Sequence, residues 1–327
     1  MRIGFAYNLK DSKFKDSDTH AEYETKETVD AVSAVLSELG QVVYLPCDGT
    51  FIKKILKEKP DVVFNIAEGW GNRDRESFVP AVLRMLGIPF TGSDATALGI
   101  TMDKALTKRI LRDAGIKTAD FLLYDKIPSE PPFFGFPAFV KPNCDGSSRG
   151  IYKHSVVFNM EELVKTVRII LGDYYQPAIA EPYLEGRDFS IGLLGNNPPY
   201  VLKPCEVLLG HEQEIKFFSY EYKKNDTDKL DFSPKIENIF LKEMRESSIK
   251  AWEILGISDY ARLDFRTDKN GIPHFLEINA LPGISPVSGI FIRQATESGF
   301  SYESIILKIL ERTLFSLNKD VKKIRNS

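Results

Sequence analysis

The chain of 327 residues contains few of the residues that build disulfide frameworks and metal clusters. It has three cysteines and four histidines. Cys47, Cys144 and Cys205 are widely spaced and odd in number, so we expect reduced thiols and neither a disulfide framework nor a zinc site. The histidines are scattered along the chain and suggest neither a metal site nor a catalytic base. The cysteine pattern therefore implies no redox chemistry.

An excess of charge of one sign and a long apolar run are also absent. The 43 basic and 46 acidic side chains give a formal net charge of -3, which does not indicate a nucleic-acid partner. No apolar run approaches membrane-spanning length, and the start is too short for a signal-peptide core, so we expect a cytoplasmic protein with no membrane association. The length and a hydrophobic content of 43% predict a globular protein of two or three domains.

The first part of the chain alternates apolar strands with amphipathic helices. Strands are predicted at 2–7, 41–45 and 61–66, and helices at 24–39 and 51–57. This βαβαβ order predicts a parallel sheet with helices on its faces and sites at the carboxyl ends of its strands. Glu68 and Gly69 fall at such an end.

The middle of the chain contains a second predicted unit. A proline-rich loop at 127–132 marks its boundary, because proline blocks both helix and central strand. Further helices are predicted at 76–86, 102–114, 160–171 and 302–317, together with a strand at 136–141 and a return strand at 151–153.

A hairpin near the end of the chain places polar residues on otherwise apolar strands. The segments around 261–265 and 275–279 are joined by a polar turn that contains Gly271. Counting by twos, Glu277 and Asn279 share one face, and Arg262 and Asp264 share a face of the partner strand. Oxygen ligands of this kind suit Mg²⁺. A surface hairpin with solvated side chains has the same pattern, so the hairpin alone leaves both interpretations open.

A lysine and a flexible loop give a second signal. Lys141 ends an apolar strand, and the loop at 145–150 offers backbone N–H groups and hydroxyls able to surround anionic oxygens. Lys141 and Lys104 are the lysines that we would assign to phosphates. Taken alone, the loop favours a plain hairpin turn. The segment 179–189 is likewise typical of an edge strand and a turn, although its polar groups would be able to grip a base and a ribose.

The order and spacing of these segments resemble the D-alanine–D-alanine ligase branch of the ATP-grasp superfamily over nearly the whole chain. The segments that carry the resemblance are 86–93, 102–108, 140–148, 185–189 and 277–283. The resemblance implies an α/β protein, α+β in its ATP-binding part: an ATP-grasp fold with an N-terminal parallel-sheet domain. The expected domains are 1–97, 98–180 and 181–327.

The resemblance also implies the role of each site residue. Lys104 and Lys141 would hold the phosphates of ATP, and Ser147 and Ser148 would close over them. Adenine would meet Glu181, Tyr183 and Leu184, and ribose would meet Asp188. Two Mg²⁺ ions, with Mn²⁺ as a substitute, would be held by Asp264, Glu277 and Asn279. Arg262 would face the transferred phosphoryl group, and Ser147 would belong to the catalytic set.

The chemistry of the family activates a carboxylate. ATP phosphorylates it to an acylphosphate, an amine attacks, and an amide or peptide forms with release of ADP and phosphate. Lys223 would act from a lid formed by the charged segment 217–229, although a solvated charge run explains that segment too. A homodimer is also implied.

The substrate end departs from the family pattern. Glu22 matches the glutamate that meets the substrate amine, and Gly283 and Ser288 match the loop that meets the second amino acid. Glu68, however, replaces a histidine, and the added carboxylate favours an amine-bearing amino-acid or carboxylate substrate. A plain carboxylate at a helix N-terminus is the alternative for Glu68.

Two other functions stay open. A biosynthetic carboxylate–amine or carboxylate–thiol ligase with another acceptor, such as a carrier protein, would keep every ATP residue and alter only the acceptor side. A non-catalytic nucleotide-binding protein would have little need to keep Arg262, Asp264, Glu277 and Asn279 together.

Overall fold

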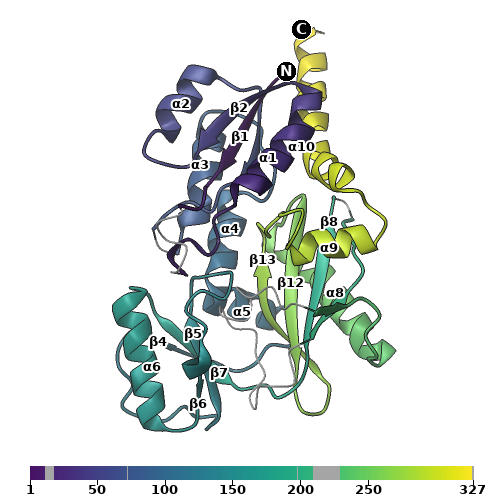
Figure 1. The fold of residues 1–327 in the computed structure, drawn as a ribbon. Coiled ribbons are helices and arrows are strands. Elements are labelled where there is room, and N and C mark those ends of the chain that lie inside the picture. The colour runs from purple at the N-terminus through teal and green to yellow at the C-terminus, as the bar shows by residue number, and fades with distance from the viewer. Residues whose placement is uncertain (12–17, 72, 197, 209–228, 326–327) are drawn as a thin grey trace.

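The computed structural model describes residues 1–11, 18–71, 73–196, 198–208 and 229–325. Its first layer is a three-stranded parallel sheet in the order β2-β1-β3 (Figure 1). Strand β3 is buried along its whole length, as expected for a parallel strand covered on both faces. The predicted βαβαβ pattern is confirmed by β1 (Arg2–Tyr7), α1 (Lys26–Leu39), β2 (Gln41–Pro46), α2 (Phe51–Glu58) and β3 (Val62–Ile66).

Short helices lead from this sheet towards the middle of the chain. The predicted helix at 76–86 begins as a 3-10 turn (Arg75–Ser77) and continues as α3 (Phe78–Met85). The predicted helix at 102–114 is confirmed by α5 (Lys104–Asp113), whereas the preceding α4 (Ala95–Met102) was not predicted. The two helices are separated by Asp103, whose backbone is extended and whose carboxylate accepts the Leu106 N–H at 2.9 Å. Asp103 is therefore an N-cap that restarts the helix.

The second sheet is antiparallel, in the order β4-β7-β5-β6, and packs against α6 (Met160–Asp173). Its strands are β4 (Leu122–Tyr124), β5 (Ala138–Pro142), β6 (Val156–Val157) and β7 (Ala178–Pro182). The prediction of a return strand at 151–153 was wrong. The Ser155 hydroxyl accepts the Tyr152 N–H at 3.1 Å and closes a 3-10 turn (Lys153–Ser155), so pairing with β5 begins only at Val156.

The third sheet follows the order β11-β10-β8-β12-β13, with β9 paired to β8. The predicted hairpin is confirmed by β12 and β13. The elements of this part are β8 (Asp188–Leu194), β9 (Tyr200–Val201), β10 (Cys205–Leu208), β11 (Lys229–Asp231), α8 (Asn238–Leu255), β12 (Tyr260–Thr267), β13 (Pro273–Asn279), α9 (Ile290–Glu297) and α10 (Tyr302–Arg325). The α/β fold class is thereby confirmed.

One apolar core joins the first and third sheets. It unites Phe5 and Phe64 of the parallel sheet with Leu263 of β12 and Ile306 of α10, all fully or almost fully buried. Helix α10 runs back to lie beside α1, so both ends of the chain lie in the N-terminal layer (Figure 1). The central sheet has a core of its own. The expected domain boundaries at 97 and 180 stay a prediction.

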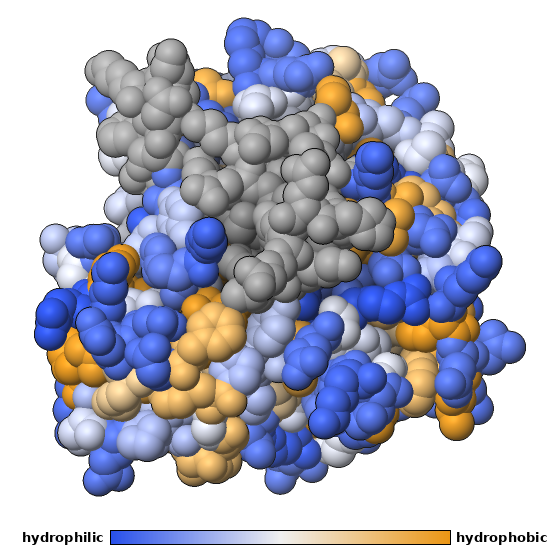
Figure 2. Space-filling model, turned by 60° about the horizontal axis from the view of Figure 1, so that its bottom comes forward, coloured by the Kyte–Doolittle hydropathy of each residue, from blue (hydrophilic) through white to orange (hydrophobic). Residues whose placement is uncertain are grey.

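On the face drawn in Figure 2, hydrophilic side chains predominate and the hydrophobic ones form small, separate groups. Within the part of the chain that the structure describes, no helix has the length and the apolar character needed to cross a membrane.

Candidate active site

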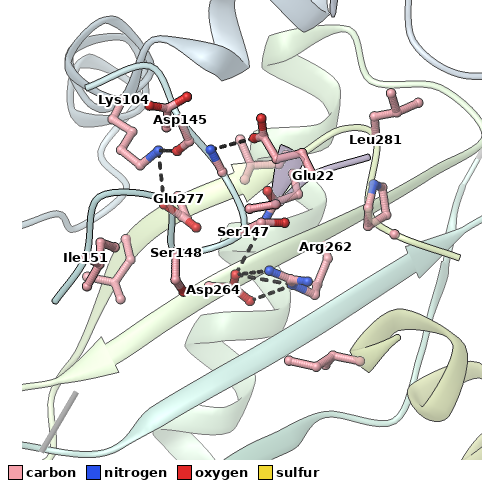
Figure 3. Close-up of a pocket in the computed structure, with 18 of the residues that line it drawn as sticks. Glu22, Lys104, Asp145, Ser147, Ser148, Ile151, Arg262, Asp264, Glu277 and Leu281 are labelled. Carbon is pink, nitrogen blue, oxygen red and sulfur yellow. Dashed lines mark hydrogen bonds and ion pairs between the residues drawn. The ribbon is translucent and has the colours of Figure 1, made fainter. Parts of the chain in front are cut away.

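A cavity lies between the two antiparallel sheets, with residues 145–148 of the loop after β5 and the N-terminal segment 21–25 along its wall (Figure 3). Lys223 falls within 209–228, outside the described residues. The structure brings all of the other predicted site residues to this one cavity: Glu22, Glu68, Lys104, Lys141, Ser147, Ser148, Glu181, Tyr183, Leu184, Asp188, Arg262, Asp264, Glu277, Asn279, Gly283 and Ser288.

The hairpin presents its polar residues on one face. In the β12–β13 register, Arg262 lies opposite Asn279 and Asp264 lies opposite Glu277, and directly opposed residues project to the same side of a sheet. The Arg262 guanidinium donates to Asp264 at 2.7 Å, and the Ser190 hydroxyl donates to the same carboxylate at 2.7 Å. Arg262, Asp264, Glu277 and Asn279 therefore form one polar group on this face of the hairpin.

The charges around Glu277 keep it ionised. Burial opposes ionisation, but the cations of Lys104, Lys141 and Arg262 hold the pKa of Glu277 at about 2. Its carboxylate lies 3.3 Å from the Lys104 ammonium. An ionised Glu277, the Asp264 carboxylate and the Asn279 amide offer the hard oxygen donors that Mg²⁺ requires, so the residues present fit that ion.

Both predicted phosphate lysines are buried at the cavity wall. Lys104, at the start of α5, donates to the Asp145 carbonyl as well as pairing with Glu277. Burial lowers its pKa, but Glu277 and Asp145 outweigh burial and raise it. Lys141 lies one residue before the end of β5, 3.3 Å from Glu181. Two fixed ammonium groups on one side of the cavity make it suitable for a polyanion.

Lys108 is a buried cation to which the sequence analysis gave no role. Its side chain is fully buried, and its ammonium lies 2.7 Å from Glu181, 2.9 Å from the Thr118 hydroxyl and 3.1 Å from the Phe275 carbonyl. Glu181 is thus held between Lys108 and Lys141. Burial would raise the pKa of Glu181, but these two lysines lower it. The arrangement ties α5 to β7 and β13, one strand from each antiparallel sheet.

Arg266 organises the opposite end of the cavity and was also missed. It pairs with Asp188 at 2.6 Å, donates to the Leu184 carbonyl at 2.6 Å and lies over the Tyr183 ring. Burial raises the pKa of Asp188, against the effect of Arg266. Three of the four residues predicted to meet adenine and ribose, namely Tyr183, Leu184 and Asp188, therefore contact one guanidinium.

The loop after Lys141 is held in an unusual conformation. Ser147 and Ser148 have φ of 51° and 57°, in the left-handed region that disfavours side chains. Arg149 of the same loop is paired with Asp145 at 2.9 Å and lies over the Tyr174 ring. Cys144 is buried, and burial raises the pKa of its thiol to about 11.

The substrate end of the cavity is rich in carboxylates. Glu68 is buried after β3, and Glu76 is hydrogen-bonded to it. Burial and neighbouring carboxylates raise the pKa of Glu68, and mainly burial raises the pKa of Glu76 to about 7. No helix begins at Glu68, so it is not a helix N-terminal carboxylate. Ser288 is exposed at the rim, near Ser285.

This geometry defines a class of protein. Two antiparallel sheets enclose a cavity that has ammonium groups on one wall and carboxylates with an arginine on the other, as in the ATP-grasp ligases. The model of the D-ala D-ala ligase C-terminus family matches residues 110–311.

Known relatives agree over most of the chain. A D-alanine–D-alanine ligase of Aquifex aeolicus is 34% identical over 87% of this chain and 94% of its own. An uncharacterized protein of Sinorhizobium fredii is 33% identical over 86% of each chain. A solved D-alanine–D-alanine ligase of Bacillus anthracis, complexed with ATP, superimposes with a TM-score of 0.75 at 24% identity, covering 98% of this chain and 99% of that one. The chain belongs to the D-alanine–D-alanine ligase family of the ATP-grasp superfamily and is a carboxylate–amine ligase of that type.

Proposed function

We propose that this protein uses ATP to join the carboxylate of one amino acid to the amine of another through an acylphosphate, releasing ADP and phosphate. One observation carries the proposal. Arg262, Asp264, Glu277 and Asn279 share one sheet face, and Lys104 approaches that face to 3.3 Å from Glu277. Such a combination suits a transferred phosphoryl group, whose charge needs both cations and a metal site.

The nucleotide would lie along the two antiparallel sheets. Adenine would lie against Glu181, Tyr183 and Leu184, with the ribose at Asp188, and the phosphates would extend towards Lys104 and Lys141. Ser147 and Ser148 would cover the phosphates. The positions of both lysines support this direction, because two ammonium groups held at the wall of a cavity favour an anionic ligand.

Asp264, Glu277 and Asn279 would hold Mg²⁺. The ion, when bound, supplies positive charge that neutralises the phosphates. Arg262, whose guanidinium lies beside Asp264 on the same face, would stabilise negative charge that develops on the reacting carboxyl. Lys223 remains the proposed lid residue.

The substrates would bind at the carboxylate-rich end. Glu22 and Glu68 would attract an amine, and Gly283 and Ser288 would meet the second substrate. D-Alanine is the first candidate for one of the two positions, because relatives of this chain are named for that amino acid. The proposal includes a homodimer, to be checked by sedimentation.

Phosphate release with ATP and Mg²⁺ tests the proposal. D- and L-amino acids should be supplied singly and in pairs, with mass spectrometry of the products and a Glu277→Gln variant as the control. We expect phosphate release with a new amide in the wild type and neither in the variant. ATP binding without release for any pair would contradict the proposed reaction.

A larger acceptor is the second candidate. Residues 286–288 at the acceptor rim are exposed, so this end of the site is open to solvent. A carrier protein with a terminal thiol or amine would then replace the second amino acid. Mass spectrometry of the carrier after incubation with ATP and a single amino acid distinguishes this reaction, because the carrier itself gains the mass of the acyl group.

A further inference from the structure

Two carboxylates of the N-terminal region hold the loop at 146–150 by its two ends. The Glu22 carboxylate accepts the Gly146 N–H at 2.6 Å (Figure 3). The Asp18 carboxylate accepts the Gly150 N–H at 3.0 Å, and also the hydroxyls of Tyr152 at 3.0 Å and Tyr174 at 2.8 Å. Hydrogen bonds to an ionised acceptor are stronger than neutral ones, so this attachment restrains the loop at both ends.

Arg75 connects the Glu22 carboxylate to the start of the loop. Its side chain is 6% exposed. The guanidinium donates to Glu22 and to the Cys144 carbonyl at 2.9 Å, and it lies 3.5 Å from Asp145. A planar guanidinium with several donors is able to hold all three groups at once, which a lysine ammonium would do less rigidly.

The loop packs closely against the Glu22 carboxylate. A Cβ at Gly146 would lie 2.5 Å from the Glu22 carboxylate, so backbone and carboxylate are packed together. Ser147 and Ser148 stay in left-handed backbone conformations between the two attachment points. Such conformations cost free energy and persist only where surrounding contacts impose them.

We propose that Arg75 and Asp18 are positioning residues, which act through Glu22 and through the loop ends to hold Ser147 and Ser148 where they cover the nucleotide phosphates. The assignment of the loop to phosphates rests on the proposed function. Among the residues that the structure describes, the cavity wall includes Glu22 and both serines but neither Asp18 nor Arg75. These two residues therefore act on the ligand indirectly, Asp18 through the loop and Arg75 through Glu22 and the loop.

Hydrogen exchange without any ligand tests the attachment itself. We expect amides of 143–152 to exchange at least about tenfold faster in Arg75→Met and Asp18→Asn, because each loses charge-assisted bonds to the loop. Arg75→Lys should give an intermediate rate. Arg312→Met is the matched control, since Arg312 pairs with buried Asp259 at 2.8 Å outside this region. Unchanged exchange of 143–152 in both Asp18→Asn and Arg75→Met, or equal acceleration in the control, would overturn the proposal.

Steady-state kinetics test the link to the nucleotide. Asp18→Asn, which keeps the size of the side chain, should raise KM for ATP about tenfold and leave KM for the amino acids unchanged. A fall in kcat with both KM values unchanged would show a merely structural role and refute the positioning assignment. If the wild-type enzyme shows no turnover, the proposed function is refuted but the attachment of the loop is not. The exchange experiment would still show whether Asp18 and Arg75 hold the loop.

Discussion

Replacing Lys108 by methionine should destabilise the protein more than any exposed lysine substitution. Methionine keeps the length of the side chain but removes the ammonium, which leaves the Glu181 carboxylate with only Lys141, at 3.3 Å. Breaking a buried ion pair on one side costs about 3–5 kcal/mol. The Phe275 carbonyl keeps the Thr118 hydroxyl as a donor at 3.1 Å, so we expect the lower end of that range.

The assay is urea and thermal unfolding followed by circular dichroism. A loss of about 3 kcal/mol corresponds to a fall in Tm of roughly 4 °C for a chain of this length that unfolds cooperatively. Lys117→Met is the control, because Lys117 is half-exposed and 3.9 Å from Glu243, a contact worth less than about 1 kcal/mol.

A double variant isolates the ion pair. Adding Glu181→Gln to Lys108→Met removes the carboxylate that has lost a partner. The double variant should therefore lose about 1–2 kcal/mol less unfolding free energy than the sum of the losses in the two single variants. A Tm of Lys108→Met within about 1 °C of the wild type would refute the reasoning. So would additivity of the two substitutions.

Three further results are expected. Glu277→Gln should abolish Mg²⁺-dependent phosphate release while the folded state is retained, since the amide removes an anionic oxygen ligand; turnover above about 1% of the wild type would contradict the metal assignment. The pKa of the buried Glu76 carboxyl is raised from 4.5 to about 7, so the folded state keeps this proton at pH values where the unfolded chain has lost it. The protonated carboxyl therefore stabilises the folded state fully below pH 4.5, and this contribution is lost as the pH rises to 7. Glu76→Gln cannot ionise, so its free energy of unfolding in urea at pH 8 should exceed that of the wild type by about 1–3 kcal/mol and approach it at pH 4.5; an equal difference at both values would contradict this. Burial raises the thiol pKa values of Cys47 and Cys205 to about 12 and that of Cys144 to about 11, so Ellman's reagent at pH 8 should label none of them within minutes in the folded protein and all three in urea.

The sequence predicted the elements whose pattern is local. The βαβαβ start and the β12–β13 hairpin follow from apolar periodicity and turn residues, and period-2 counting placed Asp264 and Glu277 correctly on their strands. The prediction at 102–114 located α5 but missed α4 (Ala95–Met102), although the ability of Asp103 to cap a helix was readable. The prediction of a return strand at 151–153 was wrong because the Ser155 hydroxyl accepts the Tyr152 N–H, which a strand would use for pairing.

The missed site residues have partners far away in the chain. Lys108 pairs with Glu181, Arg75 with Glu22, and Arg266 with Asp188, so none of these roles is visible in a local pattern. From sequence alone, a single lysine or arginine in a helix or strand is expected to lie at the surface, because such residues are rarely buried unless paired. Only the tertiary structure shows which of them are enclosed.

The packing of helix α10 affects when the N-terminal layer can be completed during synthesis. Ile305, Ile306, Ile309 and Leu310 are fully buried, and the Thr313 hydroxyl donates to the Phe90 carbonyl at 3.0 Å beside the parallel sheet. The strands of that sheet leave the ribosome first, while the helix that covers part of their core leaves last. The first layer to be translated is therefore among the last to be completed, and nascent chains that lack residues 302–325 expose its apolar surface to chaperones.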